Sequence, residues 1–446
     1  MERCLFRMRM DVDYNELIEF ELLSVAELLG VSAQDFKLSY YKDESTPCQL
    51  YSQSLTEYYR NYSPDSSISN FNRLETTDQN VFLFGTVPSI DIAKAIFDRS
   101  ILNKEVIKVW VECEDYDELL DCVLNKCKDE IEAHLLGKSW CVKYSKYNNK
   151  SNSDDIVKVL DKLLPIFQHA GDVNLINPIT KIAIIEKYNI NKKTCEKKLD
   201  RIYFGNILFE RNDSPWWTNY CLSNRPILGP TSLDNSLSFI LSNLVLHYAV
   251  SHNLGKVKNG TVVYDPFVGS GGSLISSSIF GGFCIGSDID IRILRGWGIS
   301  YIKSNTTESD EKNIFVNFNY YKLLIPDIIR FDIKYSPFKE SNGWVDTIIT
   351  DPPYGNRASY MNNKLMKNIK NDLKHKNCLE LITFLLQISL NILVKHGRLI
   401  FLLPSHINNI DESLKLINCK GFKIVYIGQQ LLTGGQCRFI ITLEKL

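Results

Sequence analysis

The sequence has little excess charge and few of the residues that bind metals. Its 446 residues include 51 basic and 52 acidic side chains, a formal net charge of −1, so any nucleic-acid site must be a local basic patch. Among 12 cysteines and 7 histidines there is no CxxC pair and no HExxH motif, which excludes the common zinc signatures. We therefore expect no metal site, and free thiols in a reducing compartment, the cytoplasm.

Long apolar runs are missing too. The N-terminal segment MERCLFRMRMDVDYNE is partly basic but lacks the apolar core of a secretory signal. No run reaches the roughly 18 apolar residues of a membrane span, so we expect no membrane segment. A composition of 44% hydrophobic and 23% charged residues is that of a globular protein, and the length predicts roughly two to three domains.

The N-terminal half mixes helix and strand signals. Apolar periodicity predicts helices at 16–29, 89–99, 115–136 and 154–169, and strands at 81–87, 105–112 and 139–145. The segment 171–190 predicts a short strand, a turn and a second strand. Residues 43–80 are polar with few aliphatic side chains, which indicates a surface insertion. We interpret residues 1–205 as an α+β region, which a linker over 206–232 joins to the rest of the chain.

The C-terminal part is more regular. A helix is predicted at 233–252, and strand and helix signals alternate after it. The predicted strands are continuous and apolar, and they lie at 261–267, 282–288, 327–332, 345–350, 397–403, 422–428 and 437–443. Such strands, alternating with helices, favour a mostly parallel, doubly wound sheet. Residues 233–446 therefore predict an α/β domain with a seven-stranded sheet whose last two strands return as a hairpin.

The most distinctive segment is DPFVGSGG at 265–272, between a predicted strand and the next helix. Its glycines allow a tight turn and a close approach of the backbone to a ligand beyond the carboxyl end of the strand. The turn is not GxGxxG and lacks the lysine of a phosphate-binding loop, so it favours a ligand without phosphates. Asp265 suits a cationic ligand that carries an amino group. A glycine-rich turn without a ligand is the alternative.

Two further acidic residues follow predicted strands. Asp288, about 20 residues after the glycines, can accept hydrogen bonds from ribose hydroxyls. Capping of the next helix is the alternative, and Asp290 fits that role at least as well. Asp332 can accept a hydrogen bond from the amino group of an adenine, with Asp327 as the competing residue.

The segment Asp351-Pro352-Pro353-Tyr354 follows the predicted strand VDTIIT and indicates the reaction class. Its two prolines fix the backbone and remove two N–H donors, which leaves carbonyl oxygens and the Asp351 carboxylate as acceptors. An exocyclic amino group offers two N–H donors to such acceptors, and Tyr354 can stack on a base. The segment favours chemistry on an amino nitrogen, in which positioning carries most of the rate and Asp351 takes up the proton. A rigid Pro-Pro loop is the alternative.

The order DPFVGSGG, GSDID and DPPYGNR resembles the S-adenosylmethionine-dependent methyltransferases that act on amino groups of nucleobases. With GPTSLD at 229–234 and RIYFG at 201–205, the chain is similar to the THUMP-domain tRNA guanine-N2-methyltransferases, which modify guanosine 10. The resemblance is carried mainly by residues 229–446. It implies a Rossmann-like methyltransferase domain preceded by an α+β, THUMP-containing region that binds RNA.

The same resemblance implies methyl transfer from S-adenosylmethionine to the exocyclic N2 amino group of a guanosine in tRNA, at position 10. It also implies an N-terminal module that grips the tRNA acceptor end, and a heterodimer with a small zinc-binding activator subunit. The residues implied to hold the target base are Asp351, Pro352, Pro353 and Tyr354. The residues implied to bind the cofactor are Asp265, Gly269 and Gly271 at the methionine moiety, Asp288 at the ribose, Asp332 at the adenine, and Phe267, Thr231 and Ser232 as further lining residues.

RNA contacts are expected to be basic. Arg357 directly follows the DPPY segment, and a run of lysines follows it over 364–376. A second basic run closes the N-terminal region and consists of Lys187, Lys192, Lys193, Lys197, Lys198 and Arg201. Both runs suit phosphates, and solvated helix faces are the alternative for each.

Three other functions fit parts of the pattern. A DNA adenine or cytosine methyltransferase shares the motif order, but its target-recognition domain is usually inserted or C-terminal, whereas the additional region here is N-terminal. A protein-glutamine methyltransferase has little need for that region. A non-catalytic RNA-binding subunit with the same fold is the third alternative, against which the intact Asp265, Gly269, Gly271 and DPPY segment argue.

Overall fold

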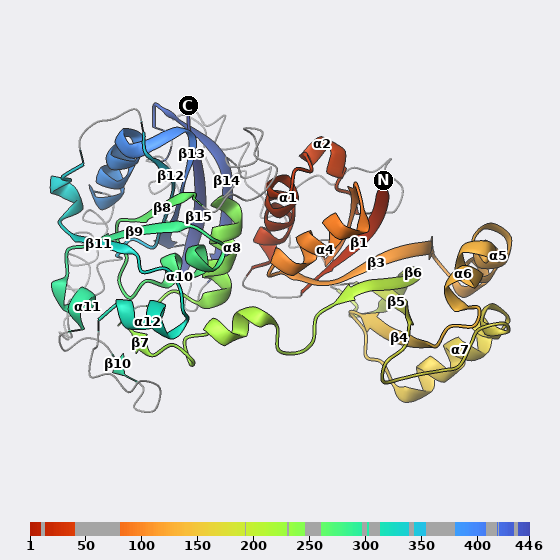
Figure 1. The fold of residues 1–446 in the computed structure, drawn as a ribbon. Coiled ribbons are helices and arrows are strands. Elements are labelled where there is room, and N and C mark those ends of the chain that lie inside the picture. Colours follow the sequence, from red (N-terminus) through yellow and green to blue (C-terminus); the bar gives the residue numbers. More distant parts are fainter. Residues whose placement is uncertain are drawn as a thin grey trace.

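The computed structural model describes residues 1–9, 14–40, 81–191, 193–229, 232–245, 260–296, 301–302, 313–338, 343–353, 380–406, 417, 419–431 and 436–446. These residues form an N-terminal unit around a six-stranded sheet and a C-terminal unit around a seven-stranded sheet (Figure 1). None of the helices in this described part of the chain is long and apolar enough to cross a membrane.

The N-terminal sheet has the strand order β2-β1-β3-β6-β5-β4. Its strands are β1 (Glu2–Met8), β2 (Phe82–Val87), β3 (Asn103–Cys113), β4 (Trp140–Tyr147), β5 (Thr180–Ile190) and β6 (Lys197–Glu210). All neighbours are antiparallel except β4 and β5.

This sheet is strongly rolled, because residues near its two edges meet. The rings of Phe82 on β2 and Tyr147 on β4 lie 5.1 Å apart between centroids. Arg7 Nη1 on β1 also donates to Ser145 Oγ on β4 at 3.2 Å. Since strands in a flat sheet are about 4.8 Å apart, four strand intervals between β1 and β4 could not be bridged by one side chain without this curvature.

Helices pack on the N-terminal sheet in two groups. The first group is α1 (Ile18–Leu28), α2 (Ala33–Phe36) and α4 (Ile90–Arg99), and the second is α5 (Tyr116–Lys126), α6 (Lys128–Leu135) and α7 (Ser153–Phe167). Ser89 Oγ caps α4 by accepting from Ile92 N at 3.3 Å, and this confirms the predicted start of that helix.

Three expectations for this half differ from the structure. The single helix predicted at 115–136 is two helices, because the chain breaks at Cys127. The short strand expected near the start of 171–190 is only an isolated bridge between Val173 and Trp140. Strands β1 and β6 were not predicted: β6 begins with the polar stretch KKLD, which hides its later apolar pattern, and it continues past residue 205 to Glu210.

The C-terminal sheet has the strand order β11-β9-β8-β12-β13-β15-β14. Its strands are β8 (Val262–Asp265), β9 (Phe283–Asp288), β11 (Asp327–Arg330), β12 (Val345–Thr350), β13 (Leu393–His406), β14 (Phe422–Leu431) and β15 (Gln436–Lys445). The first five strands in this order are parallel, and β15 is antiparallel to both β13 and β14. The predicted seven-stranded, doubly wound domain with a final hairpin is therefore confirmed.

Helices and a small second sheet surround the C-terminal sheet, and one of these helices has its described part at residues 380–392. The other helices described here are α8 (Asn235–Val245), α10 (Gly272–Ile279), α11 (Ile291–Arg295) and α12 (Phe315–Tyr320), and the small sheet pairs β7 (Ile227–Leu228) with β10 (Tyr301–Ile302). The chain between β6 and β7 contains a 3-10 helix at Trp216–Tyr220. This connection lies along the lower side of the molecule in Figure 1.

The two units dock through α1 and α8. The fully buried Glu21 on α1 accepts hydrogen bonds from Ile101 N at 2.7 Å and Leu102 N at 3.0 Å. It also accepts from Asn243 Nδ2 on α8 at 2.8 Å. Tyr14 Oη reaches Asp234 Oδ2, just before α8, at 2.9 Å. Because a buried carboxylate is tolerated only when it is well hydrogen-bonded, this contact fixes the N-terminal unit on the C-terminal one.

Candidate active site

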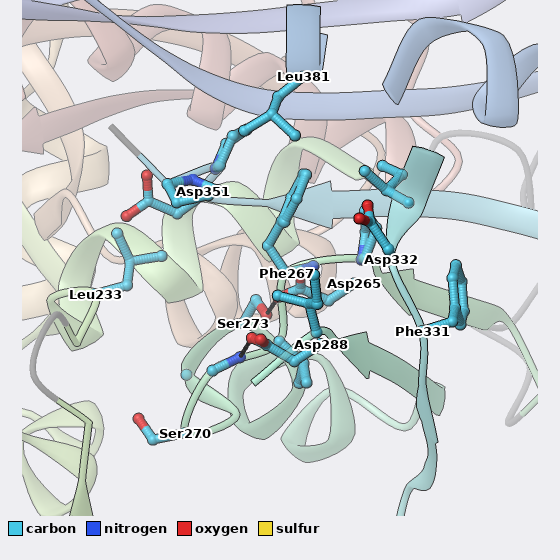
Figure 2. A pocket seen from close by; sticks show the side chains of 18 of the residues that line it. Leu233, Asp265, Phe267, Ser270, Ser273, Asp288, Phe331, Asp332, Asp351 and Leu381 are labelled. Carbon is cyan, nitrogen blue, oxygen red and sulfur yellow. Dashed lines mark hydrogen bonds between the residues drawn. The ribbon is translucent and has the colours of Figure 1, made fainter. Parts of the chain in front are cut away.

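A cavity of about 620 Å³ opens at the carboxyl ends of β8, β9 and β12. In parallel α/β sheets this is the edge at which ligands bind, and the volume is in the range of small-molecule sites. Figure 2 shows the carboxylates of Asp351 and Asp332 on either side of Phe267 in this view, with Asp265 and Asp288 below them. The residues that line the cavity are Ser232, Leu233, 265–270, Gly272, Ser273, Asp288, Ile289, 331–334, 351–353 and Leu381.

The turn after β8 takes its shape from glycines. Gly269 and Gly271 have φ values of 52° and 86°. Residues with a Cβ adopt such positive φ values only at a cost in conformational energy. A Cβ on Gly271 would lie 3.0 Å from Phe318 Cε2 on α12. Gly269 lines the cavity, whereas Gly271 shapes the turn from behind at the start of α10.

Asp265 ties this turn to the neighbouring strand. Its buried carboxylate accepts hydrogen bonds from Thr350 Oγ1 at 2.6 Å, from Phe267 N at 2.9 Å and from the Ser273 hydroxyl. Burial raises the pKa of Asp265 to about 6, the three hydrogen bonds oppose that rise, and the nearby Asp288 adds to it. Asp265 is therefore both a structural link between β8 and β12 and a carboxylate that titrates near neutral pH.

The two other predicted acids also reach the cavity. Asp288 ends β9, and its two oxygens accept from Gly269 N at 3.1 Å and Asp290 N at 2.9 Å. Asp288 lines the cavity, where a carboxylate can accept a hydrogen bond from a ligand hydroxyl. Asp332 accepts from Lys334 N at 3.0 Å.

The proline segment lies beside the glycine turn. Asp351 directly follows β12, which pairs with β8 in parallel register. Asp351, Pro352 and Pro353 all line the cavity. Tyr354 and Arg357 lie outside the described residues.

The predicted segment before α8 is described only in part. Ser232 lines the cavity, and its Oγ lies 3.3 Å from Ser270 Oγ of the glycine turn. Thr231 lies outside the described residues, as does the lysine run at 364–376.

Several lining residues were not predicted. Phe331, Ile333 and Leu381 give the cavity an apolar side, and Lys334 pairs with Glu380 at 3.1 Å. Phe331 and Ile333 flank Asp332, so the apolar residues on both sides of that acid were the available signal. Leu381 carries no local signal, because only the fold brings its helix to the carboxyl ends of the strands.

The basic residues predicted to meet RNA lie on the β5–β6 hairpin rather than on a helix. Lys193, Lys197 and Lys198 are exposed. Arg201 pairs with Glu114 at 3.2 Å, and Lys192 lies outside the described residues. Figure 1 shows β5 and β6 in the N-terminal unit, well away from the C-terminal sheet, so these residues do not join the cavity.

Comparison with known proteins identifies both units. Residues 68–212 match the Tmrp11 THUMP N-terminal domain family, and residues 225–382 match the RMKL-like methyltransferase domain family. The tRNA (guanine(10)-N(2))-methyltransferase TRMT11 of Bos taurus is 29% identical over 394 residues, which cover 83% of this chain and 81% of the relative. The human protein of that name is 28% identical with the same coverage.

Among solved structures, TrmN from Thermus thermophilus aligns over 100% of both chains, with 15% identity and a TM-score of 0.43. The two domain matches follow the same order as the two units of the structure. The match to the Bos taurus relative covers most of this chain and most of that relative. The chain thus carries a THUMP N-terminal domain followed by an RMKL-like methyltransferase domain, and over most of its length it is similar to the THUMP-domain tRNA (guanine-10-N2)-methyltransferases.

Proposed function

We propose that this protein transfers a methyl group from S-adenosylmethionine to the exocyclic N2 amino group of a guanosine in tRNA, at position 10. The observation that carries the proposal is one cavity lined by both the glycine turn after β8 and the Asp351-Pro352-Pro353 segment after β12. The Thr350–Asp265 hydrogen bond of 2.6 Å joins these two segments. The relatives named for this activity support the choice of substrate.

The cavity fits S-adenosylmethionine in charge and polarity. Four aspartates suit a cationic sulfonium that also carries an amino group. In this proposal the 265–271 turn holds the methionine moiety, and Asp288 accepts from the ribose hydroxyls. Asp332 accepts from the adenine amino group, and the apolar side chains around it cover the ring.

The proline segment would hold the target base. The Asp351 carboxylate and the backbone carbonyls of this segment are hydrogen-bond acceptors, and Pro352 and Pro353 have no backbone N–H group. Two such acceptors can hold both N–H groups of a guanine amino nitrogen and aim its lone pair at the reacting carbon. When bound, the cofactor supplies an electrophilic methyl group. Asp351 takes up the proton that the amino group loses, and positioning supplies most of the rate. We assign Tyr354 the role of stacking on the base.

The β5–β6 hairpin is the proposed phosphate contact of the N-terminal module. Lys193, Lys197 and Lys198 are exposed cations on one hairpin, which suits a polyanion. A substrate that spans both units must be long, and a folded tRNA meets that requirement. The remaining proposed RNA contacts are Arg357, Lys192 and Arg201, and Arg201 lies on β6 of the same hairpin.

We also propose the zinc-binding activator subunit as a partner. Among the described residues, β11 is the edge strand of its sheet, and an edge strand can pair with the backbone of another chain. Exposed apolar side chains lie beside it, with Leu324 67%, Ile325 50% and Ile329 37% accessible. Such an apolar edge suits a protein partner that adds a strand.

The remaining proposals concern organisation and location. We propose an N-terminal region followed by a linker that ends at residue 232 and the methyltransferase domain at 233–446; because β6 runs to Glu210, the boundary expected at 205/206 moves to 210/211. We propose a cytoplasmic location, where a tRNA substrate and free thiols are both expected.

The test is methyl transfer to an unmodified tRNA transcript, with the activator subunit added or omitted, followed by nucleoside analysis. We expect N2-methylguanosine from the wild type and a loss of at least 100-fold in rate for Asp351→Ala, in the range of a removed acid–base group. Asp290→Ala is the matched control, because Asp290 is an acid near the site that does not line the cavity. Transfer to DNA or protein but not to tRNA would leave the fold standing and overturn the substrate.

A further inference from the structure

A buried asparagine outside every motif holds the glycine turn from behind. Asn317 lies on α12 and is fully buried. Its Oδ1 accepts from Ile227 N at 2.9 Å, and its Nδ2 donates to Ile227 O at 2.9 Å and to Ser270 O at 3.2 Å. One side chain thus joins three segments that are far apart in the sequence.

The bonds to Ile227 resemble those of a sheet. The carboxamide of Asn317 pairs with both backbone groups of Ile227, as a neighbouring strand would. Ile227 begins β7, which pairs with β10 in register Ile302↔Ile227. Asn317 therefore fixes β7, the strand that leads into the segment of Ser232.

The third bond reaches the cavity wall. Ser270 lines the cavity, and its carbonyl has Asn317 Nδ2 as a donor. Its hydroxyl lies 3.3 Å from Ser232 Oγ, which also lines the cavity. Figure 2 shows Ser270 at the end of the turn that carries Asp265 and Phe267. Ser270 is thus held through its carbonyl by Asn317 and through its hydroxyl by Ser232, and it links the glycine turn to the Ser232 segment.

Helix α12 supports the same turn by packing. A Cβ built on Gly271 would lie 3.0 Å from Phe318 Cε2 and 3.3 Å from Ile314 Cδ1. Phe318 and Ile314 are both buried. The turn holds two glycines at positive φ, so it depends on its surroundings to keep this conformation, and α12 packs against it at Gly271.

We propose that Asn317 is a positioning residue of the cofactor site. It acts through Ser270, and it keeps the 265–271 turn in the binding conformation before the cofactor arrives. This inference rests on the proposed use of S-adenosylmethionine. All hydrogen-bonding groups of its carboxamide are used: two N–H groups serve two carbonyls, and the oxygen serves one N–H. Its loss would lower cofactor affinity while leaving Asp351 and its neighbours in place.

The experiment compares Asn317→Ala with Asn243→Ala in the full chain. Asn243 is also fully buried, and it also makes hydrogen bonds to Glu21 and Arg99, but it lies at the interface between the units. Calorimetry measures the Kd of S-adenosylmethionine, and thermal unfolding measures stability. We expect both variants to lose stability. Only Asn317→Ala should raise the Kd, by about tenfold, which corresponds to about 1.4 kcal/mol, with kcat at saturating cofactor nearly unchanged.

A second readout needs no cofactor. Amide hydrogen exchange at Val268, Ser270 and Gly271 should be faster in Asn317→Ala than in the wild type and unchanged in Asn243→Ala. If Asn317→Ala does not fold, Asn317→Ser, which keeps one hydrogen-bonding group, takes its place. A folded variant with wild-type Kd and wild-type exchange overturns the inference. Failure of the wild type itself to bind S-adenosylmethionine overturns the proposed cofactor, and the exchange result then decides the role of Asn317 alone.

Discussion

The pH dependence of cofactor binding should follow the ionisation of Asp265. Burial raises its pKa to about 6 in the folded protein from the usual 3.8. Below pH 6 the group becomes neutral and loses its attraction for a cationic ligand. Affinity for S-adenosylmethionine should therefore fall as the pH drops through about 6. A bound cation favours the carboxylate, so binding near pH 6 should release a proton.

Thr350→Val tests this reasoning without a change of shape. Thr350 is fully buried, and its hydroxyl donates to Asp265 Oδ1 at 2.6 Å. A hydrogen bond to a charged group contributes about 1.5–3 kcal/mol, which equals about 1–2 pKa units. The variant should move the midpoint of the binding profile up by that amount, to about pH 7–8.

The assay is calorimetric titration of S-adenosylmethionine between pH 5.5 and pH 9, with wild type and Thr350→Val measured side by side. Both proteins should bind with similar affinity at the alkaline end, where both carboxylates are ionised. Asp265→Asn should bind weakly at every pH. A wild-type profile that is flat around pH 6, or a variant profile that does not move, would refute the assignment of Asp265.

The same raised pKa has a consequence for stability. An acid whose pKa is higher in the folded state stabilises that state below its unfolded pKa, and the contribution disappears as the pH rises through the folded pKa. For Asp265 the window runs from about 3.8 to about 6, and the loss is about 3 kcal/mol. In the cofactor-free protein, protonation of Asp265 should therefore add to the free energy of unfolding as the pH falls from about 6 to about 3.8.

Three further outcomes follow from the described contacts. Glu21→Ala removes the acceptor of four donors, three in the N-terminal unit and one, Asn243, in the C-terminal unit, and it should lower the free energy of unfolding by about 3 kcal/mol, measured by urea titration. Gly271→Ala places a Cβ at positive φ against Phe318 and should cost about 1–3 kcal/mol in the same titration, and it should also raise the Kd for S-adenosylmethionine. Replacing Lys193, Lys197 and Lys198 by alanine should weaken tRNA binding and reduce its salt slope by about 3, while cofactor binding stays at the wild-type level.

The sequence was most informative where structure is local. The C-terminal strands were predictable because buried parallel strands are continuous apolar runs, as in VDTIIT before Asp351. Helix α4 was predictable because Ser89 supplies a local cap. Strand β6 was missed because its first residues are polar, and pairing with β3 and β5 rather than its own pattern makes it a strand.

The site divides in the same way. Asp265, Asp288 and Asp351 were predictable because each follows its own strand, and the ends of parallel strands meet at one edge. Asn317 and Leu381 were not predictable, because their neighbours in space are distant in sequence. The family resemblance, rather than any pattern of residues, supplied the guanosine and its position.

The strand order of the rolled N-terminal sheet decides where the chain can be cut into pieces that fold independently. The family match begins at residue 68, yet β1 (Glu2–Met8) lies between β2 and β3 in the sheet. A chain that started at residue 68 would lack β1, the strand that pairs with both β2 and β3. These two strands would lose their common neighbour, and the missing side chain of Leu5 would leave a gap in the core. The smallest N-terminal piece able to fold by itself must therefore include the first strand, and a swap of this region between relatives should exchange it from residue 1.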